Sequence, residues 1–357
     1  MAESPLYAAH EKLGATFTDF GGWTMPLKYG NELDEHRAVR GAAGLFDLSH
    51  MGEVDVTGPE AGVFLDYALI SNMSILKVGK AKYSMLVADN GGIIDDLITY
   101  RLADDHFMVV PNAGNTAAVW EALSARARDF DVELNNRSED IALVAVQGPD
   151  ALAVVQKHVD QDADALSYYS AAPMLFDGTE ILLARTGYTG EDGFELYCDF
   201  ADAAKLWDAL VGETTPCGLA SRDSLRLEAS MPLYGNELST EITPVEAGMG
   251  RAFAKKEADF VGKEALSGRE PSVVIAGLTS EQRRAARSGA EIFLPGSQDR
   301  IGVVTSGQPS PTLGYPVALA HLAPEHAEVG TDVEIDIRGR RYPFTIVDTP
   351  FYSRKDA

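Results

Sequence analysis

One stretch, residues 82–100, constrains the fold of this chain more than any other. Its Gly91-Gly92 pair is a turn signal, because glycine enters positive φ at little steric cost. The runs on either side, 82–87 and 93–100, are rich in the β-branched and aromatic residues that strands favour. With Ala88-Asp89-Asn90 completing the loop, the stretch predicts a β-hairpin.

Two adjacent carboxylates, Asp95 and Asp96, lie on the second strand of this hairpin. Neighbouring side chains on a strand point to opposite faces, so one of the two acids must turn toward the apolar side. A carboxylate there is costly unless it is hydrogen-bonded or serves chemistry. The alternative, in which both acids are solvated at the mouth of the hairpin, stays open on the stretch alone.

The length and charge of the chain limit what it can be. The chain has 357 residues, which is too many for a single small hydrophobic core, so we expect two or three domains. Its 30 basic and 54 acidic residues give a net charge of −24, which argues against nucleic-acid binding but leaves room for an anionic ligand held by one or two arginines. Since we find neither a signal peptide nor an apolar run of about 20 residues, we expect a soluble, cytoplasmic protein without membrane contact.

The order of expected elements indicates an α+β fold followed by an all-β domain. Strands alternate with helices up to a composition shift at residues 267–272, where we place the main domain boundary. Six short strands punctuated by Gly and Pro follow it, which is typical of a small barrel or sandwich. The expected helices include residues 5–10, 32–39, 58–69, 120–128 (after a capping segment at 111–116), 203–211 and 219–229. The expected late strands cover 273–278, 291–294, 301–305, 317–322, 332–337 and 341–347.

Several polar residues lie where elements end. Asn112 follows the strand expected at 107–110, where it could contact a ligand or simply cap the next helix. The glycine-rich loop 187–193 is a tight connection that aims Tyr188 and Glu195 at one place. Arg222 lies on a helix face, although a solvated helix start would explain it equally.

Common catalytic signatures are missing from the sequence. There is no HExxH, no nucleophile elbow of the form GxSxG and no GxGxxG fingerprint after a strand. Cys198 and Cys217 have no zinc or disulfide spacing, so we expect two reduced core thiols, and His50 near a strand end is more typical of a structural histidine. The remaining acids, arginine, tyrosines and amide suit a polar heteroaromatic ligand with a carboxylate tail.

Seven motifs, in this order, carry a resemblance to a known family: Phe46-Asp47-Leu48-Ser49-His50-Met51, Gly91-Gly92-Ile93-Ile94-Asp95-Asp96, Gly187-Tyr188-Thr189-Gly190-Glu191-Asp192-Gly193-Phe194-Glu195, Ser221-Arg222-Asp223-Ser224-Leu225-Arg226-Leu227-Glu228, Leu233-Tyr234-Gly235-Asn236, Thr243-Pro244-Val245-Glu246-Ala247-Gly248 and Gly302-Val303-Val304-Thr305-Ser306-Gly307. The set resembles the glycine cleavage T-protein family of aminomethyltransferases, from about residue 5 almost to the end of the chain. The resemblance implies a three-domain cloverleaf around a central folate cavity. Two α+β domains would occupy 1–270, with the inserted one at about 52–138, and a β-barrel would occupy 271–357.

The resemblance also implies a reaction and a site. A lipoylated H-protein presents an aminomethyl group, and tetrahydrofolate takes its carbon to give 5,10-methylenetetrahydrofolate, ammonia and dihydrolipoyl H-protein, without a metal. Asp96 would be the essential carboxylate that orients the folate and assists proton movement, and Asp95 on the other face would be structural. Glu195 would bind the amino-pyrimidine edge of the pterin, and Arg222 the charged end of folate. The implied pocket lining comprises Asn112, Met51, Tyr83, Tyr100, Tyr188 and Tyr234, with Arg354 near the C-terminus as a more variable contact.

Two other functions stay open on the same scaffold. One is a tetrahydrofolate-dependent demethylase of a small methylated compound, and the other is a non-enzymatic folate-binding assembly factor, whose short Cys-containing signature is absent here. To bind an acidic H-protein, this acidic chain would need a local basic patch or would have to dock in high salt. The densest basic run, residues 282–287, could serve, but a solvated surface turn is the simpler interpretation.

Overall fold

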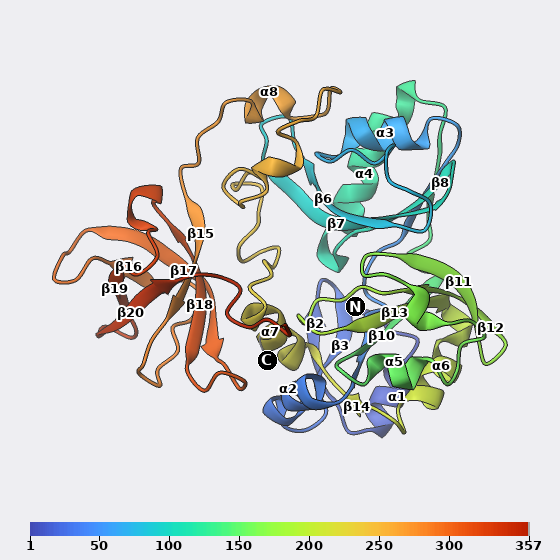
Figure 1. The fold of residues 1–357 in the computed structure, drawn as a ribbon, viewed down its shortest axis with the longest axis horizontal. Coiled ribbons are helices and arrows are strands. Elements are labelled where there is room, and N and C mark those ends of the chain that lie inside the picture. The colour runs from blue at the N-terminus through green and yellow to red at the C-terminus, as the bar shows by residue number, and fades with distance from the viewer. Residues whose placement is uncertain (356–357) are drawn as a thin grey trace. The chain divides into compact units, whose positions relative to one another are not determined.

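The computed structural model of the chain describes residues 1–355 and has a mixed α+β architecture with antiparallel sheets and a closed barrel (Figure 1). It divides into two compact units. The first contains Met1–Leu86, Ile94–Arg222 and Lys256–Val261, and the second contains Val87–Ile93, Asp223–Lys255 and the chain from Gly262 onward. The expected fold class, two α+β regions with antiparallel sheets followed by an all-β barrel, is confirmed.

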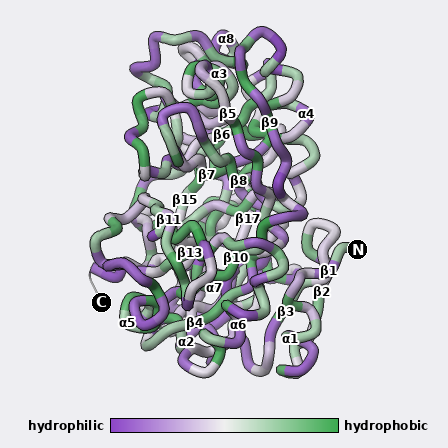
Figure 2. Tube along the Cα trace, turned by 90° about the vertical axis from the view of Figure 1, so that its right-hand side faces the viewer, coloured by the Kyte–Doolittle hydropathy of each residue, from purple (hydrophilic) through white to green (hydrophobic). Residues whose placement is uncertain are grey.

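A six-stranded sheet forms the largest core of the first unit. Its strands lie in the order β11 (Ala171–Phe176), β12 (Thr179–Ala184), β13 (Gly193–Asp199), β10 (Ile141–Gln147), β4 (Gly44–Asp47) and β14 (Thr215–Pro216). Six of the seven residues of β10 are buried, which explains its nearly continuous apolar sequence (Figure 2). Helices α5 (Ala151–Val155) and α6 (Ala203–Leu210) contribute side chains, including Trp207, to the same core.

The N-terminal segment folds beside this sheet. It comprises α1 (Tyr7–Lys12), α2 (Glu32–Gly41) and a small sheet of β1 (Ala2–Glu3), β3 (Trp23–Lys28) and β2 (Thr16–Phe20). A buried polar contact anchors it, since Nε2 of His10 lies 2.8 Å from Oδ2 of Asp47 and the Ser4 hydroxyl donates to the same oxygen. Because all three side chains are buried, this contact holds the segment against β4.

A five-stranded sheet carries the hairpin. Its strands lie in the order β6 (Ala81–Val87), β7 (Ile93–Ala103), β8 (His106–Val110), β5 (Val54–Thr57) and β9 (Glu133–Asn136). Helices α3 (Ala61–Ala68) and α4 (Thr116–Arg126) pack on one face, around Phe64 and Leu97 (Figure 1). Helix α3 begins three residues later than expected, because Gly58 adopts a φ of +124° that no helix contains.

The turn of the hairpin confirms the role of its two glycines. Gly91 has a φ of +85°, and a Cβ on Gly92 would lie only 2.0 Å from the carbonyl oxygen of Thr240. The Ala88 N–H donates to the Gly92 carbonyl at 2.8 Å and closes the turn. Any side chain at position 92 would therefore collide with backbone.

The second unit is built on a closed barrel whose strands lie in the order β15 (Val274–Thr279), β18 (Pro316–Leu322), β17 (Arg300–Pro309), β16 (Glu291–Phe293), β19 (Asp332–Asp336) and β20 (Arg341–Val347). The helical segments of its chain are α7 (Leu219–Glu228), which the unit boundary crosses, η5 (Gly250–Ala252), α8 (Lys263–Leu266) and η6 (Pro324–His326). Arg226 donates to Glu237 at 3.0 Å and to the Ser306 hydroxyl at 2.8 Å, all buried, so it ties α7 to β17.

Two further expectations concern the cysteines and membranes. Cys198 and Cys217 are buried free thiols, as expected. Within residues 1–355, no helix is long and apolar enough to span a bilayer.

Candidate functional site

The two acids of the hairpin point to opposite faces of β7, as the strand period requires. Asp95 is fully buried on the face that meets α4, whereas Asp96 is only partly buried on the other face. The interpretation in which both acids are solvated is therefore wrong. The two side chains leave β7 on opposite faces and their environments differ, although both carboxylates contact Asn112.

A tyrosine and an amide hold Asp96. The Tyr83 hydroxyl on β6 donates to Oδ2 of Asp96 at 2.9 Å, and Nδ2 of Asn112 donates to Oδ1 at 2.9 Å. Burial raises the pKa of Asp96 from 3.8 to about 6, against the opposing effect of these two donors. At neutral pH the group is mostly ionised yet close enough to its pKa to exchange a proton.

The side chain of Asn112 does not cap the helix that follows. Ile98 pairs with Val110, so the same register places Asn112 opposite Asp96, just beyond the end of β8. From there its Nδ2 donates to the Asp96 carbonyl at 2.8 Å and to Oδ1 of Asp95 at 2.9 Å. Of the two roles that the sequence left open, the structure excludes capping by this side chain.

A second polar cluster is built around Glu195 on β13. The Thr186 hydroxyl donates to Oε2 of Glu195, and the Tyr100 hydroxyl lies 2.9 Å from Thr186 and 3.4 Å from the same carboxylate oxygen. Tyr197 donates to the Tyr100 hydroxyl at 3.4 Å. Burial, followed by the charge of Glu195, raises the pKa of Tyr100 well above its usual range, so this hydroxyl keeps its proton.

Strand β7 connects the two clusters. Asp96 and Tyr100 are four residues apart, so they lie on the same face at a Cα separation of about 13 Å. The Asp96 cluster and the Glu195 cluster therefore line one face of the hairpin sheet. An elongated ligand could contact both.

A cation lies near Glu195. The guanidinium of Arg222, in the first turns of α7, stacks 5.0 Å from the ring centroid of Tyr188. Burial lowers the pKa of Arg222, and the charge of Glu195 opposes that effect. Within the described part of the chain the guanidinium has no hydrogen-bond or ion-pair partner, so its donors are available to an anion.

His50 belongs to the same neighbourhood. Burial and the positive charge of Arg222 lower the pKa of its imidazole to about 4, so the ring is neutral at pH 7. Its Nδ1 is buried without a hydrogen-bond partner in the described structure, and the Phe20 ring packs against it edge-on. Met51 follows it, next to Gly52, whose N–H donates to the Pro111 carbonyl one residue before Asn112.

Two of the predicted site residues belong to the second unit. The Tyr234 hydroxyl donates to the Ile93 carbonyl at 3.0 Å, and Arg354 is exposed near the C-terminus. In the first unit, the structure adds three residues that we did not predict, Thr186, Tyr197 and Asn115. Tyr197 was detectable, since it shares a strand face with Glu195, whereas no local pattern singled out Thr186 or Asn115.

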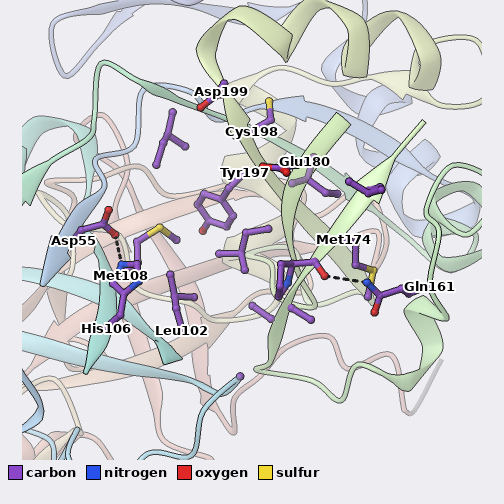
Figure 3. A pocket seen from close by; sticks show the side chains of 18 of the residues that line it. Asp55, Leu102, His106, Met108, Gln161, Met174, Glu180, Tyr197, Cys198 and Asp199 are labelled. Atoms are coloured by element: carbon purple, nitrogen blue, oxygen red, sulfur yellow. Dashed lines mark hydrogen bonds and ion pairs between the residues drawn. The ribbon is translucent and has the colours of Figure 1, made fainter. Parts of the chain in front are cut away.

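A separate groove of about 810 Å³ opens in the first unit (Figure 3). Apolar side chains such as Met108 and Met174 line it, together with an ion pair of 2.9 Å between His106 and Asp55. None of the predicted site residues lines this groove. The Tyr197 side chain borders it and, through its hydroxyl, also reaches the Glu195 cluster.

Comparison with known proteins assigns the family. Residues 6–257 match the family described as the GCVT N-terminal domain, and residues 274–353 match the glycine cleavage T-protein C-terminal barrel domain. The chain belongs to the glycine cleavage T-protein family. The predicted resemblance is thereby confirmed.

Relatives in this family support the same assignment over the whole chain. An aminomethyltransferase of Corynebacterium aurimucosum is 60% identical over 98% of both chains, and one of Streptomyces avermitilis is 51% identical over 98% of this chain and 97% of its own. The crystal structure of glycine cleavage system aminomethyltransferase T from Bartonella henselae superimposes with a TM-score of 0.93 at 38% identity, covering 99% of this chain and 98% of that one. By homology the protein is a transferase, an aminomethyltransferase of the glycine cleavage system.

The donor set offers no metal centre. Among residues 1–355, no three His, Cys, Asp or Glu side chains cluster in a way that could hold a metal ion. The groups that do converge are hydroxyls, amides and carboxylates, which bind and orient organic ligands by hydrogen bonds.

Proposed function

We propose that the protein transfers the methylene carbon of an aminomethyl-lipoyl arm, presented by H-protein, to tetrahydrofolate. The products are 5,10-methylenetetrahydrofolate, ammonia and dihydrolipoyl H-protein. The observation that carries the proposal is the shared face of β7, along which a carboxylate of pKa about 6 and the Glu195 cluster both lie. Family membership supplies the chemistry that this geometry supports.

The reaction requires protons to move but no oxidant. The carbon loses its bonds to sulfur and to the amine nitrogen and gains bonds to N5 and N10 of the folate. The two protons that leave N5 and N10 balance those gained by the lipoyl thiol and by ammonia. An ionised Asp96 near its pKa can accept one of these protons and pass it on, held in place by Tyr83 and Asn112.

Other groups would bind and orient the folate. The Glu195 carboxylate can accept two parallel N–H bonds from the amino-pyrimidine edge of a pterin. The free guanidinium of Arg222 would meet the folate carboxylate tail, with Tyr188 keeping its plane fixed. Asn112, Met51 and Tyr100 would line the same pocket, and Tyr234 and Arg354 are the remaining proposed folate contacts.

We also infer the domain organisation from the family. The folate-binding region would span residues 1–270, with an inserted domain at about 52–138, and the barrel domain would span 271–357. The five-stranded sheet, which runs from Val54 to Asn136 in sequence, supports the inserted domain. With a net charge of −24, nucleic acid is not among the partners that we propose.

A reconstituted assay tests the proposed function. Purified protein is mixed with aminomethyl-loaded lipoylated H-protein and tetrahydrofolate, and ammonia and 5,10-methylenetetrahydrofolate are measured. We expect both products in equal amounts, and little ammonia without folate. Turnover of a small methylated amine instead of the loaded H-protein would favour a demethylase, and folate binding without any turnover would favour an assembly factor.

A further inference from the structure

Asp95 is a buried acid that the proposed mechanism does not use. It has no exposed surface, and within the described residues no Lys, Arg or His pairs with it. All its hydrogen bonds come from one short segment. The Asn112 N–H donates to Oδ2 at 2.9 Å, while Nδ2 of Asn112 (2.9 Å) and Nδ2 of Asn115 (2.6 Å) donate to Oδ1.

Burying an ionised carboxylate in this way lowers the free energy of unfolding, which is not expected of a residue with only a structural role. Burial raises the pKa of Asp95 to about 7, and the charge of Asp96 adds to the rise, so the folded chain holds the ionised form at a cost. A buried asparagine would tie β7 to Asn115 through one acceptor without that cost. The carboxylate differs from an amide in one respect, because both its oxygens only accept hydrogen bonds when it is ionised.

That difference favours one orientation of the Asn112 amide, in addition to the two Asp96 oxygens that its nitrogen contacts. A side-chain amide can present either its oxygen or its nitrogen, but an acceptor-only neighbour excludes the oxygen. Nδ2 of Asn112 lies within 2.9 Å of three oxygens, Oδ1 of Asp95 and the carbonyl and Oδ1 of Asp96. Since Oδ1 of Asp95 and Oδ1 of Asp96 contact the same nitrogen, a change in the position of one carboxylate shifts the amide and, through it, the other carboxylate.

We propose that Asp95 is a positioning residue that acts through Asn112. Its carboxylate fixes the Asn112 amide with the nitrogen toward Asp96, and this fixes the direction of the Asp96 carboxylate on the opposite face of the sheet. Asp95 touches no substrate in this scheme. The inference rests on the proposed role of Asp96 and adds a second residue, behind the sheet, to the same site.

The primary test is the Asp95→Asn variant, which keeps the shape but replaces one acceptor oxygen by a donor that must face either the side-chain or the main-chain nitrogen of Asn112. We expect kcat for folate-dependent ammonia release to fall 10- to 100-fold while KM for tetrahydrofolate stays within threefold, because binding contacts remain and orientation is lost. Asp104→Asn is the matched control. It makes the same carboxylate-to-amide change at a side chain that is 96% exposed, so kcat should stay within threefold.

A double-mutant cycle separates positioning from a general structural role. In an Asn112→Ala background Asp95→Asn should change kcat by less than twofold, since the residue through which Asp95 acts is gone. The proposal is overturned if the kcat reductions of Asp95→Asn and Asn112→Ala multiply in the double variant. It is also overturned if Asp95→Asn alone retains kcat within twofold of the wild type. A loss confined to KM would overturn it as well.

A further variant is available if Asp95→Asn does not fold. Asn115→Asp leaves Asp95 in place but sets a second carboxylate against it, so that the two acids share a proton and Asp95 stops being acceptor-only. We expect at least a threefold loss of kcat, and an unchanged kcat would refute the inference. A wild-type protein without ammonia release would instead refute the proposed function, so the two failures can be distinguished.

Discussion

Replacing the Asp96 carboxylate by its amide should abolish activity and yet stabilise the folded protein at neutral pH. The pKa of Asp96 is about 6 in the folded state against 3.8 for an ordinary aspartate, so the fold disfavours the ionised form. A difference of about two pKa units corresponds to about 3 kcal/mol at pH values above both pKa values. Asp96→Asn removes this cost.

The loss of one hydrogen bond offsets part of this increase in the free energy of unfolding. The single amide oxygen cannot replace both carboxylate oxygens, so either the Tyr83 or the Asn112 donor loses its partner, at about 1 kcal/mol. The net expectation is a stabilisation of about 2 kcal/mol at pH 7.5. Activity should fall at least 100-fold, because the amide cannot accept a proton.

The pH dependence identifies the cause. Between pH 3.8 and 6 the folded carboxyl keeps its proton while the unfolded one releases it, so this group makes the wild-type protein less stable as pH rises through that window. The stability gap between variant and wild type should therefore be close to zero near pH 4 and approach its maximum above pH 7. A gap that is independent of pH would contradict this reasoning.

The assay is urea unfolding followed by tryptophan fluorescence at pH 4.5, 6 and 7.5, together with ammonia release. Asp104→Asn is the control, because the Asp104 side chain is 96% exposed and removing its charge should change stability by less than about 0.5 kcal/mol at each pH. If Asp96→Asn is less stable than wild type at pH 7.5, or keeps more than a tenth of the activity, the electrostatic account of Asp96 is refuted.

Four further predictions concern the same region. The kcat/KM of the wild-type enzyme should decline below pH of about 6 as Asp96 becomes protonated, and a profile flat down to pH 5 would argue against its role as a base. Glu195→Gln should weaken tetrahydrofolate binding about 10- to 100-fold in calorimetric titration, because the amide replaces one acceptor by a donor; unchanged affinity would exclude Glu195 as a ligand contact. Arg222→Lys should raise KM for folate about tenfold with kcat within threefold, since lysine lacks the planar fork that stacks on Tyr188; a loss in kcat alone would assign Arg222 a different role. Gly92→Ala should lower the melting temperature by several degrees, because its Cβ would meet backbone at 2.0 Å, whereas Gly212→Ala, which like Gly92 has no positive φ but has open space around its Cβ, is the control.

Much of the fold could be predicted from the sequence because its signals are local. The hairpin at residues 82–100, the six barrel strands and most helices follow from periodicity and from glycine and proline positions. The start of α3 was missed because the φ of Gly58 depends on its tertiary surroundings. Boundaries such as this are decided by packing and not by propensity.

The sequence by itself predicted that Asp95 and Asp96 point to opposite faces of a strand, since a strand alternates its faces, but it left open whether both are solvated. It also supplied the motifs that place the chain in its family. Only the tertiary structure decided what each acid contacts. Asn112 reaches Asp96 because β8 ends two residues before it, at Val110, and Tyr100 meets Glu195 across 95 residues of chain. Such contacts depend on which strands pair and how they are aligned, which local sequence preferences do not encode.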